Sequence, residues 1–139
     1  MSISTGMHIL AQGMSAQRTR LNLVASNLAN ANTTKTDEGG PYKRKDPVFR
    51  AIQVAGDGDN ESLRSVEVVE VATDPSKGPK VYDPWHPDAD AKGFVEMPNV
   101  NVVEEMVNMI TASRSFEANV QAFQTLRDLS HRAIDIGRG

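Results

Sequence analysis

The sequence contains no cysteine among its 139 residues, which excludes disulfides and thiolate chemistry and leaves the redox compartment open. Aromatic residues make up only 5% of the chain, which is low for a protein that stacks nucleic-acid bases. The formal net charge is -3 and the pI is about 5.6, which disfavours a phosphate-backbone partner. We therefore expect no nucleic-acid partner.

Long hydrophobic runs are also missing. No stretch approaches the roughly 18 consecutive apolar residues of a membrane span, and the N-terminus lacks the basic region and short apolar run of a cleaved secretory signal. We expect neither membrane insertion nor Sec-dependent export. The apolar residues instead recur at regular intervals along the chain.

The N-terminal region carries apolar residues at alternating three- and four-residue steps, interrupted only at Gln17. Such a repeat lays a seam along one side of a helix and requires another helix against it. We expect this helix to run to about Asn30, because asparagines favour helix ends. Gly6 and Gly13 each weaken it by about 0.5 to 1 kcal/mol relative to alanine, so its first turns should order only on packing. The apolar positions are Met7, Leu10, Met14, Leu21, Val24, Leu28 and Ala31.

A second long helix is predicted at the C-terminal end. It should begin at Asn101, which forms a capping box with Glu104, and should end at Gly137. Its apolar stripe is wider than one partner helix can cover, which favours further partners. A closed two-helix hairpin within one chain remains the alternative. The stripe consists of Val102, Met106, Met109, Ile110, Phe116, Val120, Phe123, Leu126 and Ile134.

The middle of the chain is rich in β-prone residues and turn residues. Pro47 suggests an edge strand or two short strands. The apolar alternation slips by one residue at Val68 and Val69, which predicts a bulge. A turn is expected at residues 57–60, and the basic run 42–45 is expected to be a solvated strand edge. The strand candidates are residues 42–54, 66–71, 80–82 and 94–97.

These patterns predict an α+β fold, in which two long terminal helices pack as a coiled-coil-like pair beside a small β-rich middle region. The predicted segments are an N-terminal helix at 1–34, the middle region at 35–98 and a C-terminal helix at 99–139. Because such helices gain most of their stability from packing, the termini of an unassembled monomer are candidates for disorder.

One loop gathers side chains that could hold a divalent cation, which would suit a small metal-dependent hydrolase built around His86. However, Lys92 stands where a calcium loop requires a ligand, and Asn99 replaces its final glutamate. A set of polar turns explains the loop better. We therefore predict no catalytic residue, no cofactor and no metal site. The loop residues concerned are Asp83, His86, Asp88 and Asp90.

Specific segments carry a resemblance to a known family. Residues 21–34 (LNLVASNLANANTT) resemble the N-terminal signature of the bacterial flagellar rod, hook and related axial proteins. Residues 38–45, 82–89, 93–100 and 104–120 extend the resemblance over nearly the whole chain. Within the family, they favour a small proximal rod subunit over another small axial rod subunit.

The resemblance implies a structural subunit of the flagellar basal body. Such a subunit leaves the cytoplasm through the flagellar type III export apparatus, without a cleaved signal, and assembles into the periplasmic rod. Its partners are other copies of itself and other rod proteins, and the rod transmits torque. A chain that has no disulfides and a marginally stable middle region suits export in the unfolded state. Burial of the apolar stripes on assembly then offsets the conformational entropy lost on folding.

We expect the terminal helices to pack against each other and against neighbouring subunits. Asn27 and Asn30 are assigned either to hydrogen bonds between subunits or to local capping alone. The predicted assembly interface consists of Met14, Leu21, Val24, Asn27, Leu28, Asn30, Met106, Ile110, Phe116, Val120 and Phe123.

Overall fold

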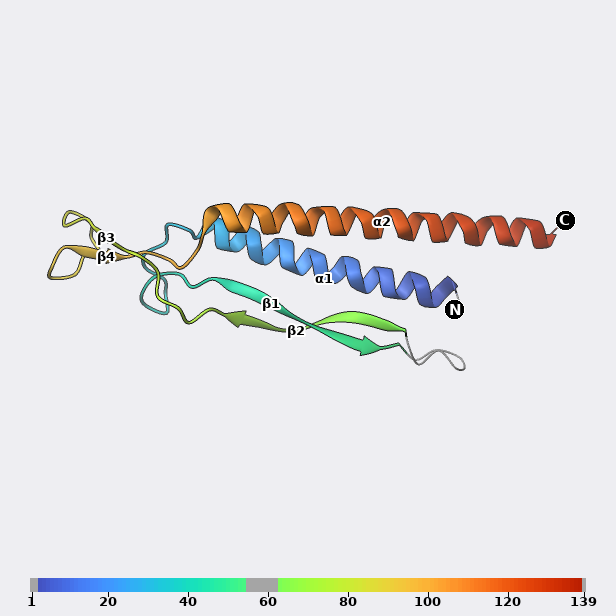
Figure 1. Cartoon of the computed structure of the whole chain (residues 1–139), viewed down its shortest axis with the longest axis horizontal. Coiled ribbons are helices and arrows are strands. Elements are labelled where there is room, and N and C mark those ends of the chain that lie inside the picture. Colours follow the sequence, from blue (N-terminus) through green and yellow to red (C-terminus); the bar gives the residue numbers. More distant parts are fainter. Residues whose placement is uncertain (1–2, 55–62, 139) are drawn as a thin grey trace.

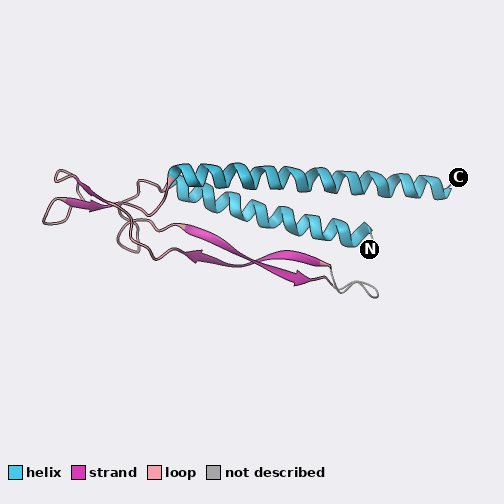
Figure 2. Cartoon of the chain, in the orientation of Figure 1, coloured by secondary structure: helices cyan, strands magenta, loops and turns pink. Residues whose placement is uncertain are grey.

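A computed structural model describes residues 3–54 and 63–138 and confirms the α+β fold. The predicted turn at 57–60 lies outside the described residues. Two long helices form one side of an elongated molecule, and two pairs of short strands lie between them in sequence (Figures 1 and 2). The elements are α1 (Ile3–Ala29), β1 (Lys45–Gln53), β2 (Arg64–Thr73), β3 (Lys80–Tyr82), β4 (Phe94–Glu96) and α2 (Val102–Arg138).

The two helices run antiparallel and lie side by side (Figure 1). α1 has 27 residues and α2 has 37, so α2 extends beyond the N-terminal end of α1. Asn101 caps α2 as predicted, because its Oδ1 accepts hydrogen bonds from the backbone N–H groups of Val103 (3.1 Å) and Glu104 (3.3 Å). α2 continues one residue past the predicted end at Gly137.

Glycines on α1 allow the helices to approach closely. A Cβ atom added at Gly6 would lie 3.1 Å from Leu126, and one added at Gly13 would lie 3.1 Å from Asn119. These two contacts are seven residues apart on both helices, the spacing of a coiled-coil seam. The glycines that weaken α1 alone therefore stand where α2 packs against it.

α1 forms the middle layer of the molecule. The antiparallel pair β1–β2 packs on α1, and in the described part of the chain neither strand contacts α2. The predicted bulge is confirmed, since the register pairs Val48 with Glu70 and Phe49 with Val68 and leaves Val69 without an opposite residue. Pro47 lies within β1, as an edge strand permits.

The remaining strands confirm the prediction for residues 80–82 and 94–97. β3 and β4 pair antiparallel with Lys80 opposite Glu96, and they form a narrow projection beyond the helices (Figure 1). The rings of Tyr82 and Phe94 meet edge to face, with centroids 5.2 Å apart. Among the described residues no helix is long and apolar enough to cross a membrane.

Candidate functional site

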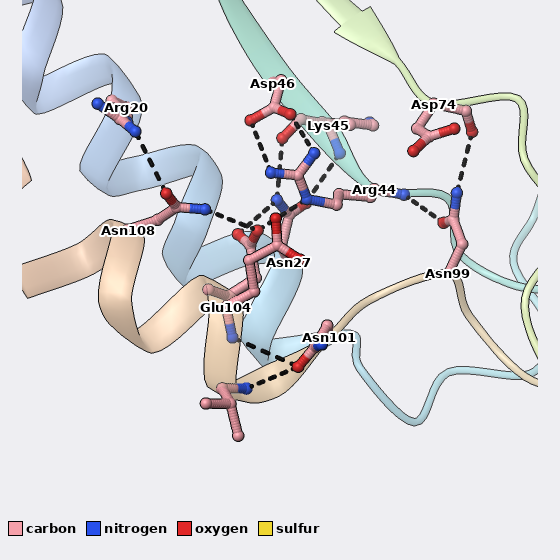
Figure 3. Close-up of polar contacts among 12 residues, drawn as sticks. Arg20, Asn27, Arg44, Lys45, Asp46, Asp74, Asn99, Asn101, Glu104 and Asn108 are labelled. Carbon is pink, nitrogen blue, oxygen red and sulfur yellow. Dashed lines mark hydrogen bonds and ion pairs between the residues drawn. The ribbon is translucent and has the colours of Figure 1, made fainter.

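A buried polar cluster joins the C-terminal end of α1, the N-terminal end of α2 and the start of β1 (Figure 3). Asn27 is fully buried. Its Nδ2 donates to the carbonyl of Lys45 and to Glu105 Oε2, both at 2.9 Å. Its Oδ1 accepts from the Tyr42 hydroxyl (2.9 Å) and from the backbone N–H of Lys45 (3.0 Å). The amide therefore uses both donors and both lone pairs within the chain.

Arg44 supplies the positive charge of this cluster. Its Nε donates to Glu105 Oε1 at 2.8 Å, and its guanidinium also pairs with Asp46. The Glu105 side chain is fully buried, and that of Arg44 is 18% exposed. Burial lowers the pKa of Arg44, but the hydrogen bond to Glu105 and the charge of Asp46 outweigh it and hold the pKa above its ordinary value. The Arg44 guanidinium therefore stays charged.

Asn99 ties the strands to the approach of α2. Its Oδ1 accepts the backbone N–H of Arg44 at 2.8 Å, and its Nδ2 donates to the carbonyls of Asp74 (3.2 Å) and Ser76 (3.1 Å). The chain just before β1 and the chain just after β2 are thus fixed to the segment that leads into α2. We call Asn27, Tyr42, Arg44, Asn99 and Glu105 the junction.

The junction corrects one expectation from the sequence. The basic run 42–45 was predicted to be a solvated strand edge. Lys43 and Lys45 are exposed, but Tyr42 is 8% exposed and Arg44 is largely buried. The strand also begins at Lys45 rather than at Tyr42. Glu105 explains the difference, because a buried carboxylate needs a cation and hydrogen-bond donors close to it.

An apolar stripe on α2 faces away from α1. Glu105 and Ala112 are both fully buried, and they mark the side of α2 that packs on the rest of the chain. The opposite side carries apolar residues at steps of three and four, which places them in one continuous row. We call this row the outer stripe. It consists of Val103, Met106, Val107 and Ile110, which are 70%, 53%, 57% and 59% exposed.

The predicted interface residues fall into three groups in the structure. Val24 and Asn27 are buried inside the chain. Met106 and Ile110 lie in the exposed outer stripe. The others are partly exposed, and they are Met14, Leu21, Leu28, Asn30, Phe116, Val120 and Phe123.

Asn30 makes local hydrogen bonds at the end of α1. Its Nδ2 donates to the carbonyl of Ser26 at 2.9 Å, and its Oδ1 accepts from the Thr33 hydroxyl at 3.1 Å. Asn27 uses all the hydrogen-bonding groups of its side chain within the chain. For these two asparagines the structure favours contacts within the chain over hydrogen bonds between subunits.

The acidic loop between β3 and β4 is built from polar turns. Asp83 accepts the backbone N–H of Trp85, and Asp90 accepts those of Lys92 (2.8 Å) and Phe94 (2.9 Å). The backbone hydrogen bond from Phe94, followed by that from Lys92, lowers the pKa of Asp90. In the part of the chain that the structure describes, no group of three or more His, Asp or Glu side chains could hold a metal ion.

The sequence reading missed Glu105 and Arg44. Both look like ordinary surface charges, and the capping box drew attention to the neighbouring Glu104 instead. One signal was available: Glu105 lies seven residues before Ala112 and fourteen before Asn119, so it falls on the α1-facing side of the helix. A charge at a seam position requires a partner, and Arg44 is that partner.

Comparison with known proteins gives two family matches. Residues 7–35 match the family "Flagella basal body rod protein", and residues 91–136 match "Flagellar basal body rod FlgEFG protein C-terminal". These two matches cover α1 beyond its first turn and nearly all of α2.

Curated relatives extend the similarity to the whole chain. The flagellar basal-body rod protein FlgC of Yersinia enterocolitica is 42% identical over 138 residues, which cover 99% of this chain and 100% of the relative. FlgC of Aquifex aeolicus is 43% identical over 97% of both chains. FlgC of Borreliella burgdorferi is 36% identical over 100% of both chains.

Proposed function

The chain belongs to the FlgC family of flagellar basal-body rod proteins, and on that premise we propose that it joins the rod through the outer stripe of α2. The family makes it a structural subunit of the flagellar basal body. The outer stripe is the observation that carries the proposal. Four adjacent apolar side chains on a helix face solvent in the monomer, and such a row is typical of a protein–protein contact.

The junction and the outer stripe have separate roles in this proposal. The junction fixes α1, α2 and the strands to one another within a subunit, and the outer stripe contacts neighbouring subunits. Leu21, Phe116 and Val120 are partly exposed and would form a separate contact at the edge of the α1–α2 seam. In terms of segments, 1–34 and 99–139 build the shaft wall, and 35–98 forms its β-rich part.

Torque transmission follows from the same arrangement. A helical assembly repeats one heterologous contact along the shaft, so a load is shared among many identical interfaces. Within each subunit, the Arg44–Glu105 pair and the four hydrogen bonds of Asn27 resist rotation of the helices against the strands. The partners are other copies of this chain and other rod proteins.

We further propose that the flagellar type III apparatus exports the chain unfolded. The absence of cysteine means that no disulfide has to be undone before transport. The apolar core is small, with Ala16, Val24, Tyr42, Val95 and Ala112 as its buried residues in the described part of the chain. A core of this size contributes little to the free energy of unfolding, so the chain is easily unfolded before transport.

The test is Ile110→Asp in a flagellated bacterium that lacks its own copy of this protein. Ile110 is 59% exposed in the monomer, so the carboxylate should leave folding intact. In an assembled contact it would be buried without a partner, which costs several kcal/mol. We expect normal helix content and thermal stability of the purified variant, together with loss of swimming and of basal bodies.

Thr111→Asp is the matched control. It adds the same charge one residue further along α2, about 100° around the helix, at an exposed position outside the outer stripe. This variant should swim normally. A motile Ile110→Asp strain, or equal loss of motility in both strains, would remove the outer stripe from the assembly contact.

A further inference from the structure

The sulfur chemistry of this chain is confined to methionine, because the sequence has six methionines and no cysteine. A thioether forms no disulfide, but peroxides oxidise it to a sulfoxide. The reaction converts a flexible apolar side chain into a polar one, so it matters most where a methionine takes part in an apolar contact. The exposure of each methionine therefore decides where such chemistry acts on the folded subunit.

Met106 differs from the other methionines that the structure describes. It is 53% exposed, whereas Met7, Met14, Met97 and Met109 are all less exposed. Met109 makes the closest comparison, since it lies three residues further along α2 and about 60° around the helix. A dissolved oxidant would reach Met106 first in the folded subunit.

Met106 stands in the middle of the outer stripe. Val103 precedes it by three residues and Ile110 follows it by four, so both lie beside it on the same side of α2. Their side chains are hydrocarbons, and neither can donate a hydrogen bond to a sulfoxide oxygen. Oxidation of Met106 would thus place a polar group in the centre of an apolar surface.

The sulfoxide would affect the free subunit and the assembled contact differently. In the free subunit Met106 faces water, so the new oxygen would be hydrated and the fold would be kept. In the contact that we propose for the outer stripe, the same oxygen would be buried among apolar side chains. Burial of a polar group without a hydrogen-bond partner is unfavourable, so the oxidised subunit would fold normally and assemble poorly.

We propose that Met106 is a reversible oxidation site, at which a peroxide blocks the outer stripe and a thiol-dependent reductase restores it. This inference rests on the proposed role of the outer stripe. The sulfur attacks one oxygen of hydrogen peroxide, the S–O bond forms and the O–O bond breaks. The other oxygen leaves as water after it takes up the proton of the transferred oxygen. The thioether loses two electrons, which the peroxide gains. In the reverse direction a methionine sulfoxide reductase uses two thiols, which form a disulfide while the oxygen leaves as water.

Peptide mass spectrometry tests whether the folded chain is oxidised at this site. The purified subunit is treated with hydrogen peroxide, and tandem spectra of the tryptic peptide 93–114 locate the added oxygen at Met97, Met106 or Met109. We expect Met106 to react several-fold faster than Met109, with no change in helix content or thermal stability. Equal rates at these two positions, or unfolding on oxidation of Met106, would overturn the inference.

Cells that lack methionine sulfoxide reductases test the effect on assembly. Each strain makes the natural chain, Met106→Leu or Met109→Leu as its only copy. Basal bodies formed after a peroxide pulse are counted relative to untreated cells of the same strain, so each variant provides its own reference. The pulse should lower this ratio several-fold more in the natural and Met109→Leu strains than in the Met106→Leu strain. Met106→Ile is a second sulfur-free variant and should match Met106→Leu, and a restored reductase gene should remove the difference.

The outcomes separate this inference from the proposed function. If the pulse lowers the ratio equally in all strains, oxidation of Met106 does not control assembly, while the role of the outer stripe stands. In isolated basal bodies Met106 should react many-fold more slowly with peroxide than in the free subunit. An equal rate in both would mean that the contact leaves Met106 uncovered, and the inference would fail. A motile Ile110→Asp strain would overturn the proposed function, and the inference with it.

Discussion

Glu105 brings a full charge into a position with no solvent exposure. The carboxylate loses its hydration on folding and regains interactions from Arg44, from the Asn27 amide and, at 3.4 Å, from the Asn108 amide. Removing one member of a buried pair leaves the other charge without compensation, which generally costs about 3 to 5 kcal/mol. Arg44 retains some solvent contact, and the value here should fall at or below the lower end of that range.

We therefore predict that Arg44→Met lowers the free energy of unfolding by about 2 to 3 kcal/mol. Urea denaturation followed by circular dichroism measures this change. The matched control is Arg50→Met, since Arg50 pairs with Glu67 on the surface and the two side chains are 60% and 48% exposed. Its effect should stay below about 1 kcal/mol.

The double variant Arg44→Met with Glu105→Met isolates the buried charge as the cause. Replacing both members of a buried pair with apolar residues of similar size is often close to neutral. The double variant should recover only part of the stability that Arg44→Met loses, because Glu105→Met also removes one of the two acceptors of the Asn27 amide. If Arg44→Met costs as much when residue 105 is already Met, the loss reflects packing of the Arg44 side chain and not an uncompensated charge on Glu105.

At the scale of the elements, the α1–α2 seam depends on small residues where the helices come closest. Gly13 faces the Asn119 amide at a distance that leaves little room for a side chain. We predict that Gly13→Leu lowers the free energy of unfolding by about 1 to 3 kcal/mol, because overpacking forces the helices apart. Gly13→Ala should be nearly neutral, since the gain in helix propensity offsets a small shift of a flexible amide.

Gly137 provides the control for this prediction. It is exposed in the last turn of α2, and a Cβ added there would meet no atom within 4 Å. Gly137→Leu should leave the stability of the monomer unchanged or raise it slightly. Equal destabilisation by the leucine at both positions would show that the effect comes from the helix backbone and not from the seam.

Periodicity made the elements predictable from the sequence. The three- and four-residue steps gave both helices, the capping pair at Asn101 gave the start of α2, and the slip at Val68 and Val69 gave the bulge. The junction was not predictable in the same way. Arg44 and Glu105 are 61 residues apart in the chain, and the apolar period of a helix does not show which charge will be buried by a distant segment.

The candidate assembly surface was only partly predicted. Met106 and Ile110 were identified from the width of the apolar stripe, and they lie in the exposed row. Val24 and Asn27 were assigned to the same interface, but they are buried within the chain. A heptad pattern shows that a residue faces another helix, and it does not show whether that helix belongs to the same molecule. The role of the exposed residues between subunits stays a prediction.

At the scale of the whole molecule, the backbone of α2 should become more mobile toward its C-terminal end. Leu126 lies beside Gly6 near the start of α1, and beyond it Leu129 and Ile136 are 52% and 82% exposed. We predict that backbone NMR of the purified monomer shows rigid amides at residues 105–126 and larger amplitudes of motion at 127–138. Equal rigidity along the whole helix would contradict this expectation, and motion throughout α1 and α2 would mean that the pair forms only on assembly.

The long sequence separation within the junction also sets the order of folding events. Asn27 and Glu105 are 78 residues apart, so the junction closes a loop of more than half the chain. Closing such a loop is slow compared with forming a helix turn or a hairpin. A chain that emerges from a narrow opening from either end cannot complete this contact until more than half of it has passed through. In a chain that emerges end first, the junction would therefore form late, and the chain would stay flexible until the ends of both helices that form the junction had passed through.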